Sequence, residues 1–170
     1  MAITFTPEDG TGIPTANSYL SVVEADDIIS TNIHATSWAG LTNDAKEKLL
    51  MWATRLLDTK ATWYGTKTYE TSGLRWPRTG VTDGDGISIP EDEIPSRLKE
   101  ATAELARSLV AIDTTAPQSR DGLTALKVDV IEFSFDKDYR IPSIPNVIWE
   151  AIRDLGYIRS GAGAAKIIKA

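Results

Sequence analysis

Cysteine is absent from the 170-residue sequence, and histidine occurs only once, as His34. Without cysteine the chain cannot form a disulfide, a thiolate zinc site, an iron–sulfur cluster or a cysteine nucleophile. A single histidine cannot build a multi-histidine metal centre, and a Ser-His-Asp triad would have to use His34 itself. Because no motif surrounds His34, we expect it to be a loop or surface residue.

Other signatures of catalysis and of ligand binding are also missing. There is no glycine-rich phosphate loop and no HExxH pattern. The run Asp83-Gly-Asp-Gly86 resembles the beginning of a calcium loop, but the glutamate that such a loop requires does not follow, which favours a tight turn. We therefore expect no cofactor, no metal ion and no enzymatic activity. A small acid-dependent enzyme is the weakest of the alternatives.

Long apolar runs are lacking as well. No stretch approaches the roughly 20 residues that span a bilayer. The N-terminus has neither the basic start nor the apolar run of a signal peptide. We expect no membrane association, and synthesis and residence in the cytosol.

The net charge of −6 and its distribution limit the possible partners. An acidic total argues against broad, nonspecific nucleic-acid binding, which depends on many contacts of Lys and Arg with phosphate. Residues 1–30 contain five acidic and no basic residues, whereas residues 137–170 contain six basic and three acidic ones. The acidic head and the basic tail could attract one another between neighbouring subunits, or the imbalance could be a chance feature of solvated surface.

Four segments show the apolar periodicity of amphipathic helices. The first begins with a capping box, in which Ser21 and Glu24 satisfy each other's backbone, and runs to about Ser30. Trp52 belongs to the apolar stripe of the second segment, so we expect it to be buried. Gly156 is expected to end the fourth. The other three helices are predicted over residues 42–58, 95–112 and 143–155.

Strand signals are few. Residues 126–135 alternate and are rich in β-branched and aromatic types, with a slip at Val130-Ile131 that predicts a bulge or a break into two short strands. Residues 81–89 predict a tight turn or small hairpin.

These elements predict a mainly α fold, a compact bundle of about four helices with a small β-hairpin element and extended N- and C-terminal arms. The expected layout is an N-terminal arm over 1–17, a helical domain over 18–156 with its β element at about 123–136, and a C-terminal arm over 157–170.

Residues 55–78 combine basic and aromatic side chains, and two interpretations are open. At single-strand binding surfaces, cations follow the nucleic-acid backbone while aromatic rings stack on the bases. The favoured alternative is that Trp63 and Trp76 are core or subunit-interface residues, since tryptophan, tyrosine and arginine are common there. The bases and aromatic residues of this segment are Arg55, Lys60, Trp63, Tyr64, Lys67, Tyr69, Arg75, Trp76 and Arg78.

The Trp76-Pro-Arg78 turn leads into the Asp83–Gly86 loop, and Pro77 fixes its backbone. We expect Trp76 to be largely buried, either in the core or against an adjacent subunit. We expect Arg78 to pair with a carboxylate.

Three stretches, in this order, resemble a family of tailed-phage proteins. They are Ala16-Asn-Ser-Tyr-Leu-Ser-Val-Val-Glu-Ala-Asp26, then Ala53-Thr-Arg-Leu-Leu-Asp58 with Trp63-Tyr-Gly65, then Leu74-Arg-Trp-Pro-Arg-Thr-Gly-Val81 followed by Asp83-Gly-Asp-Gly86 and Ile89-Pro-Glu-Asp-Glu-Ile-Pro95. Over roughly residues 16–112 the chain is similar to the proteins catalogued as DnaT-like single-strand-binding proteins, several of which are head-tail connectors or adaptors. The Trp-Pro-Arg-Thr-Gly segment is the most specific part of the resemblance.

The resemblance implies a structural virion protein, a head-tail connector (adaptor or head-completion protein) that forms a ring below the portal. Such a ring, expected to be a dodecamer, extends the DNA channel and provides the docking surface for the tail. Its implied partners are the portal protein and a tail terminator, stopper or tail tube protein, with duplex DNA passing through the lumen without specific binding. The implied location is the virion neck, and the host cytoplasm during assembly.

The same resemblance implies an alternative function, that of a single-stranded DNA-binding replication protein that uses residues 55–78. For the connector, we expect a monomer or weak oligomer in isolation that becomes a ring on the portal.

The candidate interface combines residues of segment 55–78 with residues of the C-terminal arm. The tail beyond Gly156 contains isoleucines that an exposed tail would not need, so we hypothesise that residues 157–170 dock on the portal or on a neighbouring subunit. The candidate residues for subunit, portal or tail contact are Trp63, Tyr64, Trp76, Arg78, Arg159, Ile167, Ile168 and Lys169.

Overall fold

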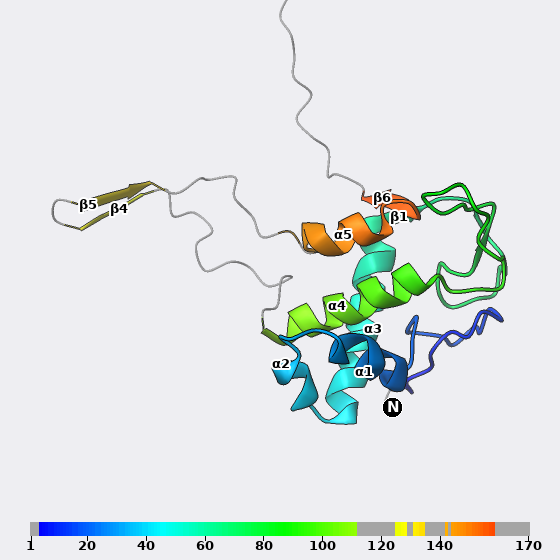
Figure 1. Ribbon diagram of the computed structural model, residues 1–170, viewed down its shortest axis with the longest axis horizontal. Helices are drawn as coiled ribbons and strands as arrows, with labels where there is room; N and C mark the ends of the chain where they lie inside the picture. Colours follow the sequence, from blue (N-terminus) through cyan, green and yellow to red (C-terminus); the bar gives the residue numbers. More distant parts are fainter. Residues whose placement is uncertain (1–3, 112–124, 129–130, 135–141, 143, 159–170) are drawn as a thin grey trace, which may run out of the picture.

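The computed structural model describes residues 4–111, 125–128, 131–134, 142 and 144–158, and it confirms the expected mainly α fold with a small β-hairpin element (Figure 1). The helices are α1 (Val22–Ser30), α2 (Thr36–Ala39), α3 (Asn43–Lys60), α4 (Ser96–Ala111) and α5 (Asn146–Ile152). The strands are β1 (Ala61–Trp63), β2 (Thr66–Lys67), β3 (Arg78–Thr79), β4 (Ala125–Val128), β5 (Ile131–Ser134) and β6 (Gly156–Ile158).

The helical body is built around the crossing of α3 and α4. Figure 1 shows α4 passing in front of α3, with α5 on one side of α4 and α1 on the other, and each of these helices packs against α4. The strands form antiparallel pairs, β1 with β6, β2 with β3 and β4 with β5. The β4–β5 pair lies where one strand signal with a break was expected, and the prediction of two short strands is confirmed.

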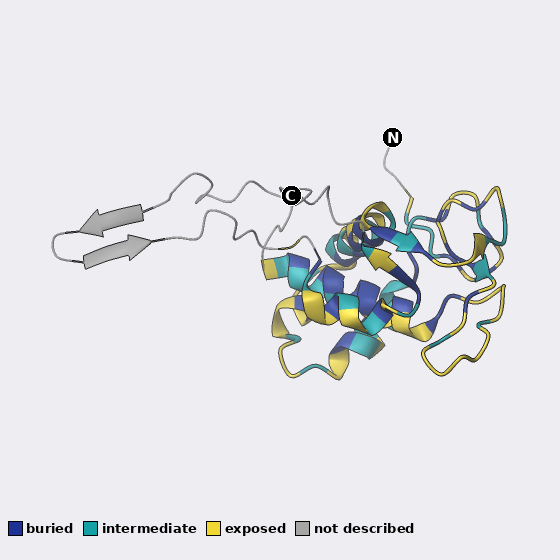
Figure 2. Ribbon diagram, turned by 90° about the horizontal axis from the view of Figure 1, so that it is seen from above, coloured by how far each residue is buried: buried dark blue, intermediate teal, exposed yellow. Residues whose placement is uncertain are grey.

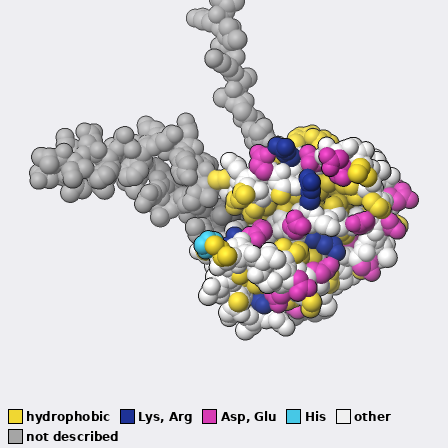
Figure 3. Space-filling view, in the orientation of Figure 1, with side chains coloured by type: hydrophobic (Ala, Val, Ile, Leu, Met, Phe, Trp, Pro, Cys, Tyr) yellow, Lys and Arg dark blue, Asp and Glu magenta, His cyan; other side chains and the backbone are white. Residues whose placement is uncertain are grey.

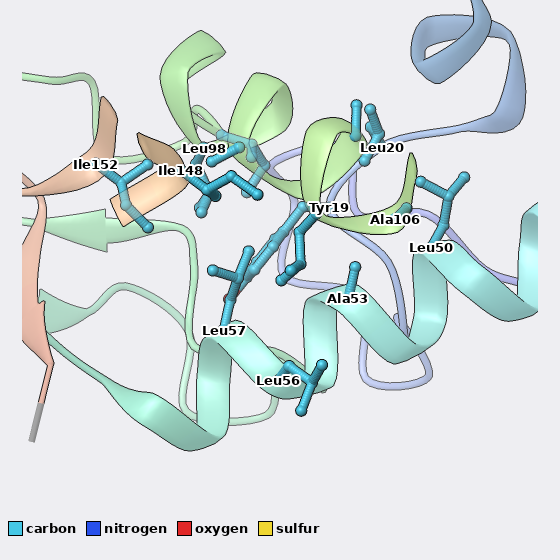
Figure 4. Packing of buried hydrophobic residues seen from close by; sticks show 14 of the residues in the cluster. Tyr19, Leu20, Leu50, Ala53, Leu56, Leu57, Leu98, Ala106, Ile148 and Ile152 are labelled. Atoms are coloured by element: carbon cyan, nitrogen blue, oxygen red, sulfur yellow. The ribbon is translucent and has the colours of Figure 1, made fainter. Parts of the chain in front are cut away.

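The core lies between the inward faces of these helices, as the close view in Figure 4 shows. Tyr19 and Leu20, from the segment before α1, enter it beside the helical side chains and are fully buried. The outer sides of the helices carry the exposed residues (Figure 2). The buried residues labelled in Figure 4 are Tyr19, Leu20, Leu50, Ala53, Leu56, Leu57, Leu98, Ala106, Ile148 and Ile152.

For one residue of the apolar face predicted over residues 42–58, the expected burial is wrong. Trp52 is 38% exposed, whereas its neighbour Ala53 is fully buried. The buried face of α3 is centred on Leu50, Ala53 and Leu57, and Trp52 lies about 100° around the helix from Ala53. Its apolar character suggested burial, but its position on the helix turns it toward the surface.

A capping box begins α1, and hydrogen bonds to Asp26 of α1 join this helix to α2 and α3. The capping box of α1 is confirmed, since the Ser21 side chain accepts from the Glu24 amide and the Glu24 carboxylate accepts from the Ser21 amide at 2.7 Å. The buried Lys46 of α3 donates to Asp26 of α1 at 2.8 Å, and Trp38 of α2 donates to the same carboxylate at 2.7 Å. The helix α2 was not predicted because four residues are too few to show a helical period.

The irregular segment expected over residues 1–17 is described from residue 4 and packs on the body. Glu8 is only 3% exposed, and its carboxylate accepts from the amides of Gly10, Gly12 and Ile13 at 3.1, 2.8 and 3.0 Å. The Ile13 carbonyl in turn accepts from the Gly73 amide at 3.0 Å. One carboxylate thus replaces the backbone partners that an irregular segment lacks.

The C-terminal end of the described body differs from the prediction. The helix α5 ends at Ile152, before Gly156, and Gly156 opens strand β6 instead of capping a helix. A Cβ atom at this glycine would lie 2.5 Å from the Thr62 carbonyl oxygen and 3.0 Å from the Trp63 Cα atom. Gly156 is therefore needed for the close approach of β6 to β1.

The turn expected over residues 81–89 is confirmed as a small hairpin. Thr82 and Ser88 form an antiparallel bridge, and the Asp83 amide donates to the Ile87 carbonyl at 2.8 Å. The Asp83 carboxylate accepts from the amides of Asp85 and Ile87 within the same loop.

Within the described part of the chain, no helix has both the length and the apolar character needed to cross a membrane.

Candidate nucleic-acid interface

The two tryptophans of segment 55–78 belong to the core of the chain. Trp63 is 5% exposed and Trp76 is fully buried, and their rings pack edge to face with centroids 6.1 Å apart and planes at 79°. The predicted burial of Trp76 is confirmed, and the core interpretation holds for both residues. Neither ring presents a face on which a nucleic-acid base could stack.

Asp58, at the end of α3, joins the segments around these tryptophans. Its carboxylate accepts from the Tyr19 hydroxyl, from the Trp63 indole at 3.1 Å and from the Arg75 amide at 3.2 Å. Burial raises the pKa of the Asp58 carboxyl above its usual value, although the hydrogen bonds from its donors offset part of that rise. Burial and the nearby Asp58 charge together raise the pKa of the Tyr19 phenol.

Among the described residues Arg78 pairs with no carboxylate, contrary to the prediction. Its guanidinium donates to three backbone carbonyls, those of Tyr64 at 2.6 Å, Gly65 at 2.6 Å and Arg75 at 3.1 Å. Partial burial lowers the pKa of Arg78. The planar fork of donors thus joins two loop segments, Tyr64–Gly65 and the turn at Arg75.

Two other residues of segment 55–78, Lys67 and Tyr69, also make contacts that stabilise the loops. The Lys67 ammonium donates to the Ser72 carbonyl at 2.6 Å. Tyr69 lies so close to Gly12 that a Cβ atom there would be 2.4 Å from its ring. These contacts leave only part of the basic and aromatic segment available to a ligand.

The aromatic surface that remains is formed by Tyr64 and Tyr157. Tyr64 follows β1 and is 47% exposed, Tyr157 lies in β6 and is 49% exposed, and their ring centroids are 6.1 Å apart at a tilt of 43°. The register that pairs Thr62 with Tyr157 and the bond from the Tyr64 amide to the Leu155 carbonyl hold the two rings on one side of the ladder. Tyr157 was not among the predicted site residues, because it was expected to lie in the C-terminal arm.

The Arg78 guanidinium lies against the backbone of Tyr64, one member of this aromatic pair. Arg78 is bonded to the Tyr64 carbonyl, and Arg75, which is exposed, is close enough for its charge to contribute to the lowered pKa of Arg78. An exposed aromatic pair with the Arg78 guanidinium bonded to the backbone of one of its members has the composition of a small base-stacking site. It is smaller than the site that the sequence suggested.

The other candidate residues fall into two groups. Arg159, Ile167, Ile168 and Lys169 lie outside the described residues. His34 is exposed, as expected, and its backbone amide donates to the Asn32 side chain at 2.9 Å. Within the described residues, no three His, Cys, Asp or Glu side chains are grouped so that they could hold a metal ion.

The comparison with protein families gives one result. Residues 3–169 match the family described as "Putative DnaT-like ssDNA binding protein", so the chain belongs to this family. No curated protein and no solved structure matches the chain.

Proposed function

We propose that this member of the DnaT-like family is a structural virion protein, a head-tail connector that forms a ring below the portal and provides the docking surface for the tail. The observation that carries this proposal is the position of the basic and aromatic side chains of segment 55–78. Trp63, Trp76 and Arg78, which a single-strand binding surface would need on the outside, hold the chain's own core and loops together.

The charge of the chain supports the same proposal. A channel through which duplex DNA slides must not retain it, and an acidic protein has few cations to offer the phosphates. The net charge is −6. On this proposal the partners are other copies of the chain, the portal protein and a tail terminator, stopper or tube protein, and the location is the virion neck.

Electron microscopy of the purified protein, alone and mixed with its portal protein, tests the proposal. We expect single subunits or weak oligomers alone and a collar of subunits at one end of the portal in the mixture. Portal particles that never acquire a collar, at protein concentrations well above those of the portal, would contradict the connector function.

Single-stranded DNA binding is the second candidate, and the Tyr64–Tyr157 pair is the observation that favours it, together with the description of the family. Base–aromatic stacking contributes about 1–3 kcal/mol per base. If the pair binds bases, changing both tyrosines to alanine should weaken the binding of an oligothymidine at least about tenfold, as fluorescence anisotropy would show. Val147→Ala, at an exposed apolar residue of α5, is the matched control and should leave binding unchanged.

A further inference from the structure

The outward face of α3 carries an exposed tryptophan between basic residues. Lys48, Trp52, Arg55 and Thr59 are all exposed, and their spacing places them in one stripe along the helix. The Arg55 guanidinium lies over the Trp52 ring, 5.7 Å from its centroid. Lys60, also exposed, ends the helix. We call these exposed residues, Lys48 to Lys60, the α3 stripe.

The charges of the α3 stripe are largely unmatched within the chain. Among the described residues, Arg55 and Lys60 form no ion pair, and Lys48 pairs only with the exposed Asp44 one turn earlier. Tryptophan and arginine are the residue types that most often anchor protein interfaces. A stacked Trp–Arg pair with free cations is therefore suited to an apolar and acidic partner.

The chain itself contains a surface of the opposite kind. Between Arg78 and Arg97 the sequence has five acidic residues and no basic one. Four of these acids are exposed and form no ion pair with a described residue, and Ile87, at the tip of the hairpin, is 66% exposed. We call this surface the acidic loop, and its residues are Asp83, Asp85, Ile87, Glu91, Asp92 and Glu93.

The two surfaces lie on different parts of the body. In Figure 1, α3 runs behind α4 through the middle of the body, and the green segment that contains the acidic loop lies at the right-hand end. Acidic side chains follow that right-hand edge in the space-filling view of Figure 3. A contact that joins two different surfaces of identical subunits is head-to-tail, and it repeats from one subunit to the next, which gives a ring when the rotation between subunits closes.

We propose that the α3 stripe of one subunit binds the acidic loop of a second copy of this chain, with Ile87 near Trp52 and the acids near Arg55 and Lys60. This inference rests on the proposed ring and identifies its subunit contact. A single-stranded nucleic acid is a poorer occupant of the stripe, because Asp44 and Glu47 flank its few cations and interrupt a path for phosphates.

Charge reversal on each side of the contact tests the inference. Arg55→Glu with Lys60→Glu makes both surfaces acidic, and Glu91→Lys, Asp92→Lys and Glu93→Lys together make both basic. Each variant alone should fail to form the collar on the portal and should sediment as a monomer even at high protein concentration. An equal mixture should regain both the collar and self-association, because each reversed surface then meets a complementary one.

Crosslinking provides a second test, since the chain has no cysteine of its own. Trp52→Cys mixed with Ile87→Cys should give crosslinked dimers with a short bismaleimide, and the double variant should give a ladder of higher oligomers. Val147→Cys, at another exposed apolar residue, is the control and should give no product with Trp52→Cys.

The outcomes separate this inference from the proposed function. If the charge-reversal variants form collars as readily as the unchanged protein, and Trp52→Cys does not crosslink to Ile87→Cys, the proposed contact is wrong while the connector function stands. If the unchanged protein forms no collar, the connector function fails. If the Arg55→Glu, Lys60→Glu variant instead loses affinity for oligothymidine, the stripe is a nucleic-acid site and the inference is overturned.

Discussion

Asp58 receives donors from three segments that are distant in sequence. Tyr19 precedes α1, Trp63 lies in β1, and Arg75 lies in the loop before β3. An ionised carboxylate can accept all three hydrogen bonds because it has no donor of its own. Asp58 therefore holds these three segments together, and we expect its removal to destabilise all of them.

Asp58→Asn should lower the free energy of unfolding by about 1–3 kcal/mol at neutral pH, because the amide nitrogen would face the Arg75 amide, donor to donor. The raised pKa of Asp58 also predicts a pH dependence. A carboxyl with a raised pKa in the folded state stabilises the fold most below its ordinary value of 3.8, and that stabilisation is lost as the pH rises through the folded value.

Urea unfolding of both proteins between pH 4 and 7 provides the measurement. The stability of the unchanged protein relative to Asp58→Asn should fall as the pH rises in this range. A difference that grows with pH would contradict this prediction, because it would show that the hydrogen bonds to the carboxylate outweigh its burial and lower the pKa of Asp58 in the folded protein.

Trp76 combines complete burial with an indole N–H that has no hydrogen-bond partner among the described residues. Trp76→Ala should cost about 3–5 kcal/mol, because it leaves a large cavity beside Trp63. Trp76→Phe should cost much less, since it keeps a ring against Trp63 and removes a donor that makes no bond. Denaturant unfolding followed by circular dichroism measures both, and Trp52→Phe, at an exposed residue, should change stability by less than about 0.5 kcal/mol.

Single residues were predictable where burial alone decides their position. The burial of Trp76 was predicted from its residue type and its place beside Pro77 in a turn, and the structure confirms it. The partner of Arg78 did not follow, because it consists of backbone carbonyls that converge only after the loops have folded. The Tyr64–Tyr157 pair depends on strand pairing between distant parts of the chain, which one sequence does not encode in any local pattern.

At the scale of elements, the helices were the predictable part. Their apolar residues recur with a period of 3.6, which only an amphipathic helix explains, and the capping box gave the first residue of α1. The helix α3 lies where it was predicted, but the burial expected for Trp52 was wrong, because its residue type was given more weight than its position on the helix. Strand β6 was missed because three residues are too few to show alternation, and its partner β1 lies far away in sequence.

Gly156 tests whether the β1–β6 pair is as close as the structure places it. Gly156→Ala should cost about 1–3 kcal/mol, because the added methyl group meets the backbone of β1, which cannot move aside as a side chain could. It should also reduce the contact between Tyr64 and Tyr157, which near-ultraviolet circular dichroism reports.

Gly40→Ala is the matched control for this substitution. Gly40 has φ of −78°, and its added Cβ atom would come no closer than 3.8 Å to the Thr36 carbonyl. Alanine there should be neutral or stabilising by up to about 1 kcal/mol. Equal effects of the two substitutions would mean that β6 does not lie against β1.

At the scale of the whole molecule, the acidic head is less available to a neighbour than its charge suggests. Glu8 binds backbone amides, Glu24 pairs with Lys99 at 2.7 Å and Asp26 pairs with Lys46 at 2.8 Å. These contacts use most of the acids of residues 1–30 within the chain. An attraction between the acidic residues 1–30 and the basic tail of a neighbouring subunit would have to depend on the remaining acids, Asp9 and Asp27. The acidic loop offers more unpaired carboxylates than these two.

The overall charge also leads to a prediction about DNA. The slope of log K against log salt measures how many phosphates a protein neutralises, and a protein that lets duplex DNA pass should show weak binding and a shallow slope. We expect dissociation constants above the micromolar range for both duplex and single-stranded oligonucleotides, measured by fluorescence titration at ~50 and ~200 mM salt. Lys60→Gln with Arg75→Gln should change this residual binding little.

Micromolar or tighter binding of single strands with tryptophan quenching and a steep slope would contradict the prediction, because it would require a continuous cationic path beside exposed rings. The connector proposal would then give way to single-strand binding.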